Sequence, residues 1–532
     1  MIRRLLAFLL LLSLSTACEK TVVVQPELTC SLSDVILPAG AGATAEFTVT
    51  ASGKWKISAS GTGYSVSPAQ GKRGTTRVTL KADDANDAMR LRDLGDLTVC
   101  LLADRREESL RVFQQPERSQ QTLLMYFPWS GNQNTLTRFF EMNIEDMESV
   151  VAQGVLENER VVVFFMPTET QAELFELHAV DGTCRRVLLK RYTDLPDFTT
   201  PDGLASILGD VRRAAPAQRY AMTVSCHGMA WLPASQARAG YRAGREKEHW
   251  EYENPDGPVT RWFGGSVYQT EIEDLAAGIA QAGMKMEYVL FDACYMATVE
   301  VAYALRRAAE RLIVSPTEVM GPGFPYTSIG RYMVGRVDYA AVCREFYEFY
   351  MTYRYPYGTI SVTECAEMEA LADVMRRINE RFTFDATSAN LAALQRMDGY
   401  SPVRFFDLGD YVRQLCGDPA LLSEFEAQLE RTVPSACRYH TPSFYSASHG
   451  GAYYPVRTYS GITISDPSVS PAVVDFKQAT EWWRATHRVA PAGVSNCCVS
   501  GIFQPDSVCL PTGIWQCSHL ALSSLPTTSH PE

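Results

Sequence analysis

The chain has 532 residues, of which 46% are hydrophobic and 21% charged, as in a globular protein with room for about two to four domains. Its 49 basic and 61 acidic residues leave a net charge of −12. Because nucleic acids and anionic lipids select basic surfaces, this balance argues against either as the main partner.

The N-terminus has the features of an export signal. The basic start Met1–Arg4 precedes an apolar run over 5–14 that is too short to span a bilayer. Small residues then lead to Cys18, which resembles a bacterial lipobox. We predict a lipoprotein signal peptide over 1–17, lipidation of Cys18 and a tether over 18–27. The protein would then be exported and lipid-anchored at the bacterial outer membrane or cell surface; ordinary secretion after cleavage nearby is the alternative.

The next segment, from Leu28 to Gln115, consists of short runs in which polar and apolar residues alternate, separated by turns rich in Gly, Ser and Asp. This spacing predicts a β-sandwich. The expected strands are 45–50, 54–58, 76–80, 97–102 and 110–114.

The same segment resembles the BACON domain, an immunoglobulin-like module of Bacteroidetes surface proteins. The resemblance rests on Trp55 after a Gly-Lys turn, on residues 66–71, on Arg90 and on the closing residues 112–115. It implies an immunoglobulin-like β-sandwich and a glycan as a further partner. Tyr64 stands where the family often has a second Trp, and Trp55 is expected in the core rather than on a sugar-binding platform.

Residues 116–121 are expected to be a linker to a larger α/β domain over 122–490. Continuous apolar strands alternate there with helices, which predicts a mostly parallel sheet covered on both faces. The expected strands are 122–127, 160–166, 311–315, 358–363, a hairpin of 173–180 and 184–190, a glycine-bounded strand across 446–454, and the runs that lead to His227 and Cys294. The expected helices are 136–153, 203–215, 271–282, 296–309 and an amphipathic segment within 365–382. The tail 491–532 lacks periodicity; it is either a disordered tail or a reading-frame artefact, and we assign it no function.

Two of these strands end on a reactive side chain. The run from Tyr220 stops at His227-Gly228, and the run from Glu287 stops at Asp292-Ala-Cys294. A free cysteine has a pKa of about 8.5, so it needs a nearby base or cation to become a thiolate. Adjacent parallel strands would bring the imidazole and the thiol to one edge of the sheet, where ligands bind in such folds. The pair indicates a cysteine hydrolase.

With their neighbours, the two motifs resemble the clostripain family of cysteine peptidases, in the caspase-like clan. Residues 123–126, the helix after Cys294, the strand and loop over 313–326 and the two motifs carry the resemblance, which covers about 122–487. It implies a caspase-like α/β/α sandwich. It also implies that Cys294 is the nucleophile, that His227 is the general acid/base, and that the backbone N–H groups of Gly228 and Cys294 form an oxyanion hole.

The resemblance further implies cleavage after Arg or Lys. By the resemblance, Asp292 is one acid of the substrate pocket. Since residues i and i+2 of a strand share a face, its carboxylate is expected to reach the same side as Cys294. The loop that carries the family's second acid lacks a carboxylate here, and Glu318 is the nearest substitute. Self-cleavage is predicted after Arg242 or Arg245; a merely solvated loop is the alternative.

No cofactor or metal is expected, since no zinc-type spacing and no EF-hand pattern occur among the 14 cysteines and the acidic residues. His440 and His449 follow the nucleophile in the chain, whereas the clan's histidine precedes it, so structural or substrate-contacting roles are expected for both. Two functions remain open. One is a surface-anchored endopeptidase that acts on proteins or peptides; the other is a catalytically inactive binding or adhesion lipoprotein that uses the β-sandwich.

Overall fold

The computed structural model describes residues 27–129, 136–233, 270–354, 356–448 and 451–487. Several predictions therefore lie outside the described residues: the signal peptide, Cys18, the self-cleavage sites Arg242 and Arg245, His449 and the tail. Within the described ranges, no helix combines the length and the apolarity needed to cross a membrane.

The N-terminal region is made of strands, as predicted. One sheet has the order β1-β3-β7-β5 and the other β2-β9-β8-β4-β6. Side chains on alternate positions of both sheets form one buried cluster. The strands are β1 Leu28–Cys30, β2 Asp34–Leu37, β3 Thr44–Ala51, β4 Trp55–Ala59, β5 Tyr64–Ser67, β6 Gln70–Gly71, β7 Gly74–Ala82, β8 Arg92–Leu101 and β9 Glu107–Gln114.

Trp55 belongs to this core, which confirms its predicted position. Its side chain is 1% exposed. Gly71 lies against the indole so closely that a Cβ there would overlap the ring. The indole is therefore packed between the sheets and presents no face to a sugar.

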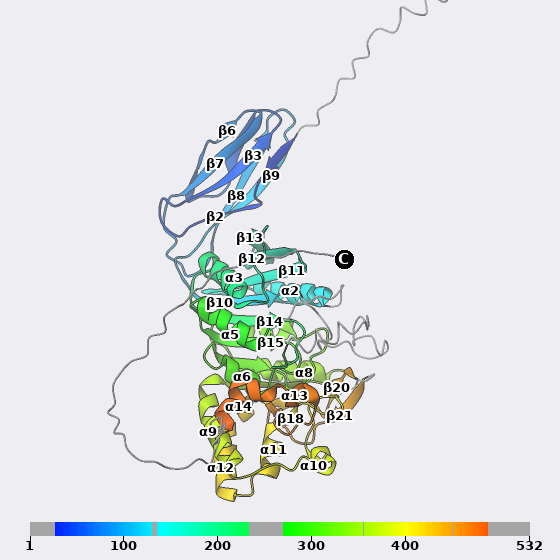
Figure 1. Cartoon of the computed structure of the whole chain (residues 1–532). Coiled ribbons are helices and arrows are strands. Elements are labelled where there is room, and N and C mark those ends of the chain that lie inside the picture. The colour runs from blue at the N-terminus through cyan, green and yellow to red at the C-terminus, as the bar shows by residue number, and fades with distance from the viewer. Residues whose placement is uncertain (1–26, 130–135, 234–269, 355, 449–450, 488–532) are drawn as a thin grey trace, which may run out of the picture. The chain divides into compact units, whose positions relative to one another are not determined.

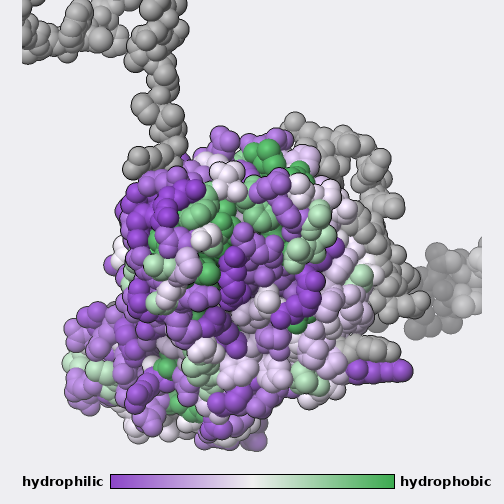
Figure 2. Space-filling view, turned by 90° about the horizontal axis from the view of Figure 1, so that it is seen from below, coloured by the Kyte–Doolittle hydropathy of each residue, from purple (hydrophilic) through white to green (hydrophobic). Residues whose placement is uncertain are grey.

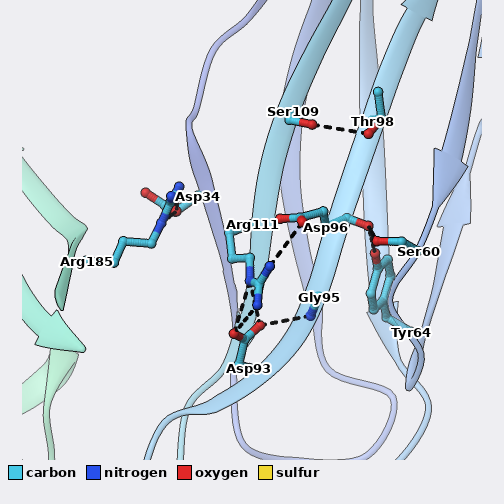
Figure 3. A network of polar contacts seen from close by, with 10 residues as sticks. All are labelled: Asp34, Ser60, Tyr64, Asp93, Gly95, Asp96, Thr98, Ser109, Arg111 and Arg185. Atoms are coloured by element: carbon cyan, nitrogen blue, oxygen red, sulfur yellow. Dashed lines mark hydrogen bonds and ion pairs between the residues drawn. The ribbon is translucent and has the colours of Figure 1, made fainter. Parts of the chain in front are cut away.

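A polar network ties β8 to β9 on the outside of the second sheet (Figure 3). The Arg111 guanidinium donates to Asp93 at 2.6 Å and to Asp96 at 3.0 Å. The Asp93 carboxylate also accepts the N–H of Gly95, where the two strands slip in register. These hydrogen bonds hold the carboxyl pKa of Asp93 below its usual value against the opposing effect of burial, which is the larger single influence. The network stabilises the irregular start of β8.

The larger domain is built on a nine-stranded sheet with the order β13-β12-β11-β10-β14-β15-β16-β17-β19. The five strands from β11 to β16 are parallel, and both outer pairs are antiparallel. The sheet is therefore mixed, with its parallel part in the centre. The strands are β10 Ser119–Phe127, β11 Glu159–Thr168, β12 Gln171–Val180, β13 Thr183–Tyr192, β14 Ala217–Ser225, β15 Met286–Asp292, β16 Ala309–Val314, β17 Thr359–Glu364 and β19 Tyr439–His440.

Helices cover both faces of this sheet (Figure 1). Alternate residues of β10 enter different clusters: Leu124 and Tyr126 pack on one side, Leu123 and Met125 on the other. The first side carries α3 Pro201–Ala214, α5 Ile272–Gln281, α6 Val299–Leu305 and α9 Met368–Asn379, and the second carries α2 Thr137–Ala152, α7 Tyr326–Ile329 and α8 Tyr339–Met351. Because both faces are covered, each central strand contains a continuous apolar run, which is the pattern that the sequence predicted.

The remaining elements follow β17 in the chain. They are α10 Ser388–Ala393, α11 Leu408–Leu415, α12 Pro419–Thr432, α13 Pro471–Val474, α14 Glu481–Thr486, the short strands β18 Phe406–Asp407, β20 Ser443–Ser446, β21 Ala452–Pro455 and β22 Thr463–Ile464, and the 3-10 turns Gly330–Tyr332, Cys365–Glu367, Ser435–Cys437 and Lys477–Ala479. The face seen in Figure 2 is mainly hydrophilic, and its hydrophobic residues form small separate areas. Among the described residues, this face offers no broad apolar surface.

Three predicted elements differ from the structure. The single strand across 446–454 is wrong: β20 and β21 pair as an antiparallel hairpin, with Ser446 opposite Ala452. The helix predicted over 296–309 begins only at Val299, because the Thr298 side chain caps it by accepting the N–H of Val301 at 3.2 Å. Strand β10 begins at Ser119, inside the expected linker, where the Ser119 N–H bonds to a carbonyl of the loop before β14.

Candidate active site

The His and Cys motifs follow neighbouring parallel strands. In the register of β14 and β15, Ser225 lies opposite Asp292. His227 and Cys294 each follow these paired residues by two positions. Both motifs therefore leave the sheet side by side at its carboxyl edge, where the sequence predicted them.

The two motifs touch through their backbones. A Cβ built on Gly228 would overlap the carbonyl oxygen of Cys294 and lie 2.9 Å from its nitrogen. It would also lie 3.0 Å from the Cβ of Ala293. Only a residue without a side chain fits between His227 and the nucleophile segment. His227 is 8% exposed and Cys294 is fully buried.

The sulfur of Cys294 lies against the backbone of the loop that follows β16. The N–H of Val319 donates to Sγ at 3.2 Å, and Sγ lies 3.7 Å from the carbonyl oxygen of the same residue. The neutral thiol can donate to this carbonyl, and once the proton has left, the N–H of Val319 remains as a donor to the sulfur.

The segment after Cys294 is held on both sides by main-chain hydrogen bonds. The N–H of Tyr295 donates to Thr317 at 2.9 Å, and that of Ala297 donates to Ser315 at 3.0 Å. Thr463, in β22, donates to the carbonyl of Ala297 through its N–H at 2.9 Å and its hydroxyl at 3.0 Å. These contacts fix residues 295–297 without regular secondary structure, which is why α6 starts later than the sequence predicted.

Asp292 is fully buried at the end of β15. Its carboxylate accepts the hydroxyl of Tyr326 at 3.3 Å and that of Ser225 at 3.4 Å. The strand ends at Asp292, so the alternation rule does not extend to Cys294. Tyr326 packs with the cluster on one face of the sheet, whereas Cys294 packs with the cluster on the other.

Glu318 is 2% exposed and binds groups of its own chain. Its Oε1 accepts the hydroxyl of Tyr295 at 2.7 Å and the hydroxyl of Ser446. Both of its oxygens accept the N–H of Ala447 at 3.0 Å. Reasoning from sequence assigned no role to Tyr295, Val319, Ser446 and Ala447, because their contacts use hydroxyl and backbone groups that are common throughout the chain and come from segments far apart in it.

His440 lies in β19, away from this arrangement of contacts. Its Nδ1 is 2.9 Å from the carbonyl oxygen of Thr441, and its ring packs against that of Tyr459 in a tilted arrangement, with 4.9 Å between centroids. In the described part of the chain, no group of three or more His, Cys, Asp or Glu side chains is placed to hold a metal ion.

An α/β fold with a thiol and an imidazole at the carboxyl edge of adjacent parallel strands defines a class of cysteine hydrolases. The model of the clostripain family matches residues 128–415, and the chain belongs to this family of cysteine peptidases. A search of curated proteins found no match.

Solved structures of similar proteins agree with this assignment. A secreted C11 cysteine protease from Bacteroides thetaiotaomicron, iotapain, is 49% identical with a TM-score of 0.62, and the match covers 70% of this chain and all of that one. An inactive zymogen of a C11 protease from Parabacteroides distasonis is 27% identical with a TM-score of 0.58, covering 70% and 99%. A secreted C11 cysteine protease of B. thetaiotaomicron, in complex with an irreversible peptide inhibitor, is 21% identical with a TM-score of 0.56, covers 69% and 98%, and supports the fold alone.

Proposed function

We propose that the protein is an exported endopeptidase that cleaves peptide bonds through a Cys294–His227 dyad. The observation that carries this proposal is the packing of Gly228 against the backbone of Cys294, which leaves no room for a Cβ. That contact joins the segment of the base to the segment of the nucleophile.

In the proposed reaction, the thiolate of Cys294 attacks the scissile carbonyl and forms a tetrahedral oxyanion. The N–H groups of Gly228 and Cys294 stabilise this charge. The imidazolium of His227 protonates the leaving amine, which leaves a thioester on Cys294. His227 then takes a proton from water, and the resulting hydroxide attacks the thioester, which releases the carboxylic acid and restores the thiolate of Cys294 beside the imidazolium of His227.

We propose a preference for Arg or Lys before the scissile bond. Asp292 is the buried carboxylate at the end of the nucleophile's strand, and one carboxylate can bind a guanidinium through two parallel hydrogen bonds. The hydroxyls of Ser225 and Tyr326, which donate to Asp292, would hold its carboxylate in place for such a contact.

The rest of the proposal concerns the other parts of the chain. The core domain is a caspase-like α/β/α sandwich over about 122–490, and the strand-rich region 28–115 is an immunoglobulin-like, BACON-like module. Lipidation of Cys18 anchors the protein to the outer membrane or cell surface, and cleavage after Arg242 or Arg245 activates it. A glycan ligand for the sandwich gains no support from Trp55, whose ring is buried. A binding lipoprotein without activity is the alternative.

The test is a panel of fluorogenic peptides that differ only in the residue before the cleaved bond. Cys294→Ala should abolish hydrolysis, and Asp292→Asn should raise KM for peptides ending in Arg or Lys more than for neutral ones. Cys365→Ala is the matched control, because it removes another buried thiol, in the 3-10 turn after β17 and outside the two motifs of the proposed dyad. Undiminished hydrolysis by Cys294→Ala would refute the dyad and favour the binding lipoprotein.

A further inference from the structure

Glu318 links two segments that are far apart in the chain. Through Oε1 it accepts the hydroxyl of Tyr295, the residue that follows the nucleophile, at 2.7 Å. Through both oxygens it accepts the N–H of Ala447, and Ser446 also donates to it. A carboxylate that is 2% exposed needs such donors to remain charged, and both oxygens act as acceptors here.

Tyr295 has a backbone conformation that requires support. Its φ of 62° lies in the left-handed region, which residues with a side chain adopt rarely and keep only when their surroundings enforce it. The side chain is fully buried, and its ring packs 5.2 Å from Phe405 and 6.2 Å from Tyr400, centroid to centroid. The bond to Glu318 fixes the far end of the same side chain.

The residue after Glu318 reaches the nucleophile itself. Val319 donates its N–H to the sulfur of Cys294 at 3.2 Å. The side chain of residue 318 and the backbone of residue 319 thus act on two consecutive residues, Tyr295 and Cys294. A shift of Glu318 would move both contacts together.

We propose that Glu318 is a positioning residue for Cys294. By holding Tyr295 it keeps the backbone N–H of Cys294 in the geometry of the oxyanion hole, and it keeps the sulfur at the N–H of Val319, which stabilises the thiolate. This role rests on the proposed function, in which Cys294 is the nucleophile. It also differs from a contact with substrate, because donors from three residues of the protein already occupy the carboxylate.

Other ionisable groups lie around this arrangement. Asp398, buried at the turn before Tyr400, accepts three backbone N–H groups, and burial raises its pKa to about 6 despite them. Tyr400 packs against Tyr295, and the Arg404 guanidinium lies over the ring of Tyr400. His227 precedes the glycine that packs on Cys294. The alkylation rate of Cys294 as a function of pH depends on the titration of all these groups. The test therefore compares this pH profile between variants and does not interpret a single profile by itself.

The experiment measures the rate at which iodoacetamide alkylates Cys294 in the full chain between pH 5 and pH 9, by peptide mass mapping. In this reaction the thiolate sulfur displaces iodide, so the rate follows the thiolate fraction. Glu318→Gln should slow alkylation at pH 6 by about fivefold or more, shift the profile to higher pH, and lower kcat more than it changes KM. Glu310→Gln, an exposed acid on the strand that leads to this loop, is the matched control and should leave the profile unchanged.

Tyr295→Phe keeps the test decisive if Glu318→Gln folds poorly, because it removes only the hydroxyl. It should shift the profile in the same direction, and the double variant should shift it less than the sum of the two single shifts. An unchanged alkylation profile in Tyr295→Phe, or a rise in KM alone in Glu318→Gln, would overturn the positioning role. Alkylation does not require peptide hydrolysis, so failure of the proposed function would instead show as activity in Cys294→Ala.

Discussion

Replacing Gly228 with Ala tests the contact on which the dyad depends. The added methyl carbon would lie 2.9 Å from the nitrogen of Cys294 and would overlap its carbonyl oxygen. Ordinary contacts of a Cβ begin at 3.4 Å, and both opposing atoms belong to the backbone. The two segments must therefore separate by about half an ångström at the nitrogen and by about 1 Å at the overlapping carbonyl oxygen, since close-packed interiors transmit such strain rather than absorb it.

This separation acts directly on the reacting groups. His227 and the N–H of Gly228, the proposed base and the proposed oxyanion donor, would both move away from the sulfur. A misplacement on the order of 1 Å costs about 100-fold in rate, which corresponds to about 2.7 kcal/mol of transition-state stabilisation. We expect kcat/KM of Gly228→Ala to fall by about that factor, with a loss of about 1–3 kcal/mol in stability from overpacking.

The assay is hydrolysis of the best peptide of the panel, with thermal unfolding measured on the same preparation. Gly209→Ala is the matched control: it lies within α3, and its Cβ would meet only the tip of the Arg213 side chain at 3.4 Å. This control should be fully active and slightly stabilised, because alanine is the better helix former. A kcat/KM for Gly228→Ala within about threefold of the parent enzyme would refute the reasoning, because a 0.5 Å shift on the scale above would cost more than that.

Two further predictions concern stability. Burial raises the pKa of Glu300 to about 7, and burial followed by the charge of Glu300 raises that of Asp466 to about 7. Between the unfolded-state pKa and the raised folded-state pKa of these carboxyls, the folded state holds more protons than the unfolded state. The free energy of unfolding therefore falls as pH rises from about 4.5 to 7. Glu300→Gln should leave stability unchanged at pH 4. At pH 8 it should raise the free energy of unfolding by about 3 kcal/mol at most, and Tm with it; equal Tm values at pH 8 would contradict this. Glu176→Ala should lower the free energy of unfolding, measured with a denaturant, by about 3–5 kcal/mol, because it leaves the fully buried Arg160 without its carboxylate. The double variant Arg160→Met with Glu176→Leu should recover most of that loss. An unchanged free energy of unfolding in Glu176→Ala would disprove the argument.

The sequence alone was sufficient for the elements that local patterns specify. Strands β10, β11, β14, β15 and β16 are continuous apolar runs, and the hairpin β12–β13 was predicted with its turn. Helices α2, α3 and α5 lie within a few residues of their predicted positions. Parallel strands end at a common edge, so the placement of His227 beside Cys294 followed from their position just after two such strands. Trp55 was predicted in the core of the N-terminal sheets for a similarly local reason, its place in an alternating strand.

Only the tertiary structure could decide how that edge is built. Glu318 meets Ala447 across 129 positions of the chain, and the backbone of Val319 reaches the sulfur of Cys294 across 25. Hydrogen bonds of this kind depend on the conformations of loops and on main-chain groups that every residue possesses, so neither periodicity nor residue type predicts them. The left-handed Tyr295, the late start of α6 and the antiparallel addition of β17 and β19 to the sheet have the same origin: long-range contacts outweighed the weak local preferences of these segments.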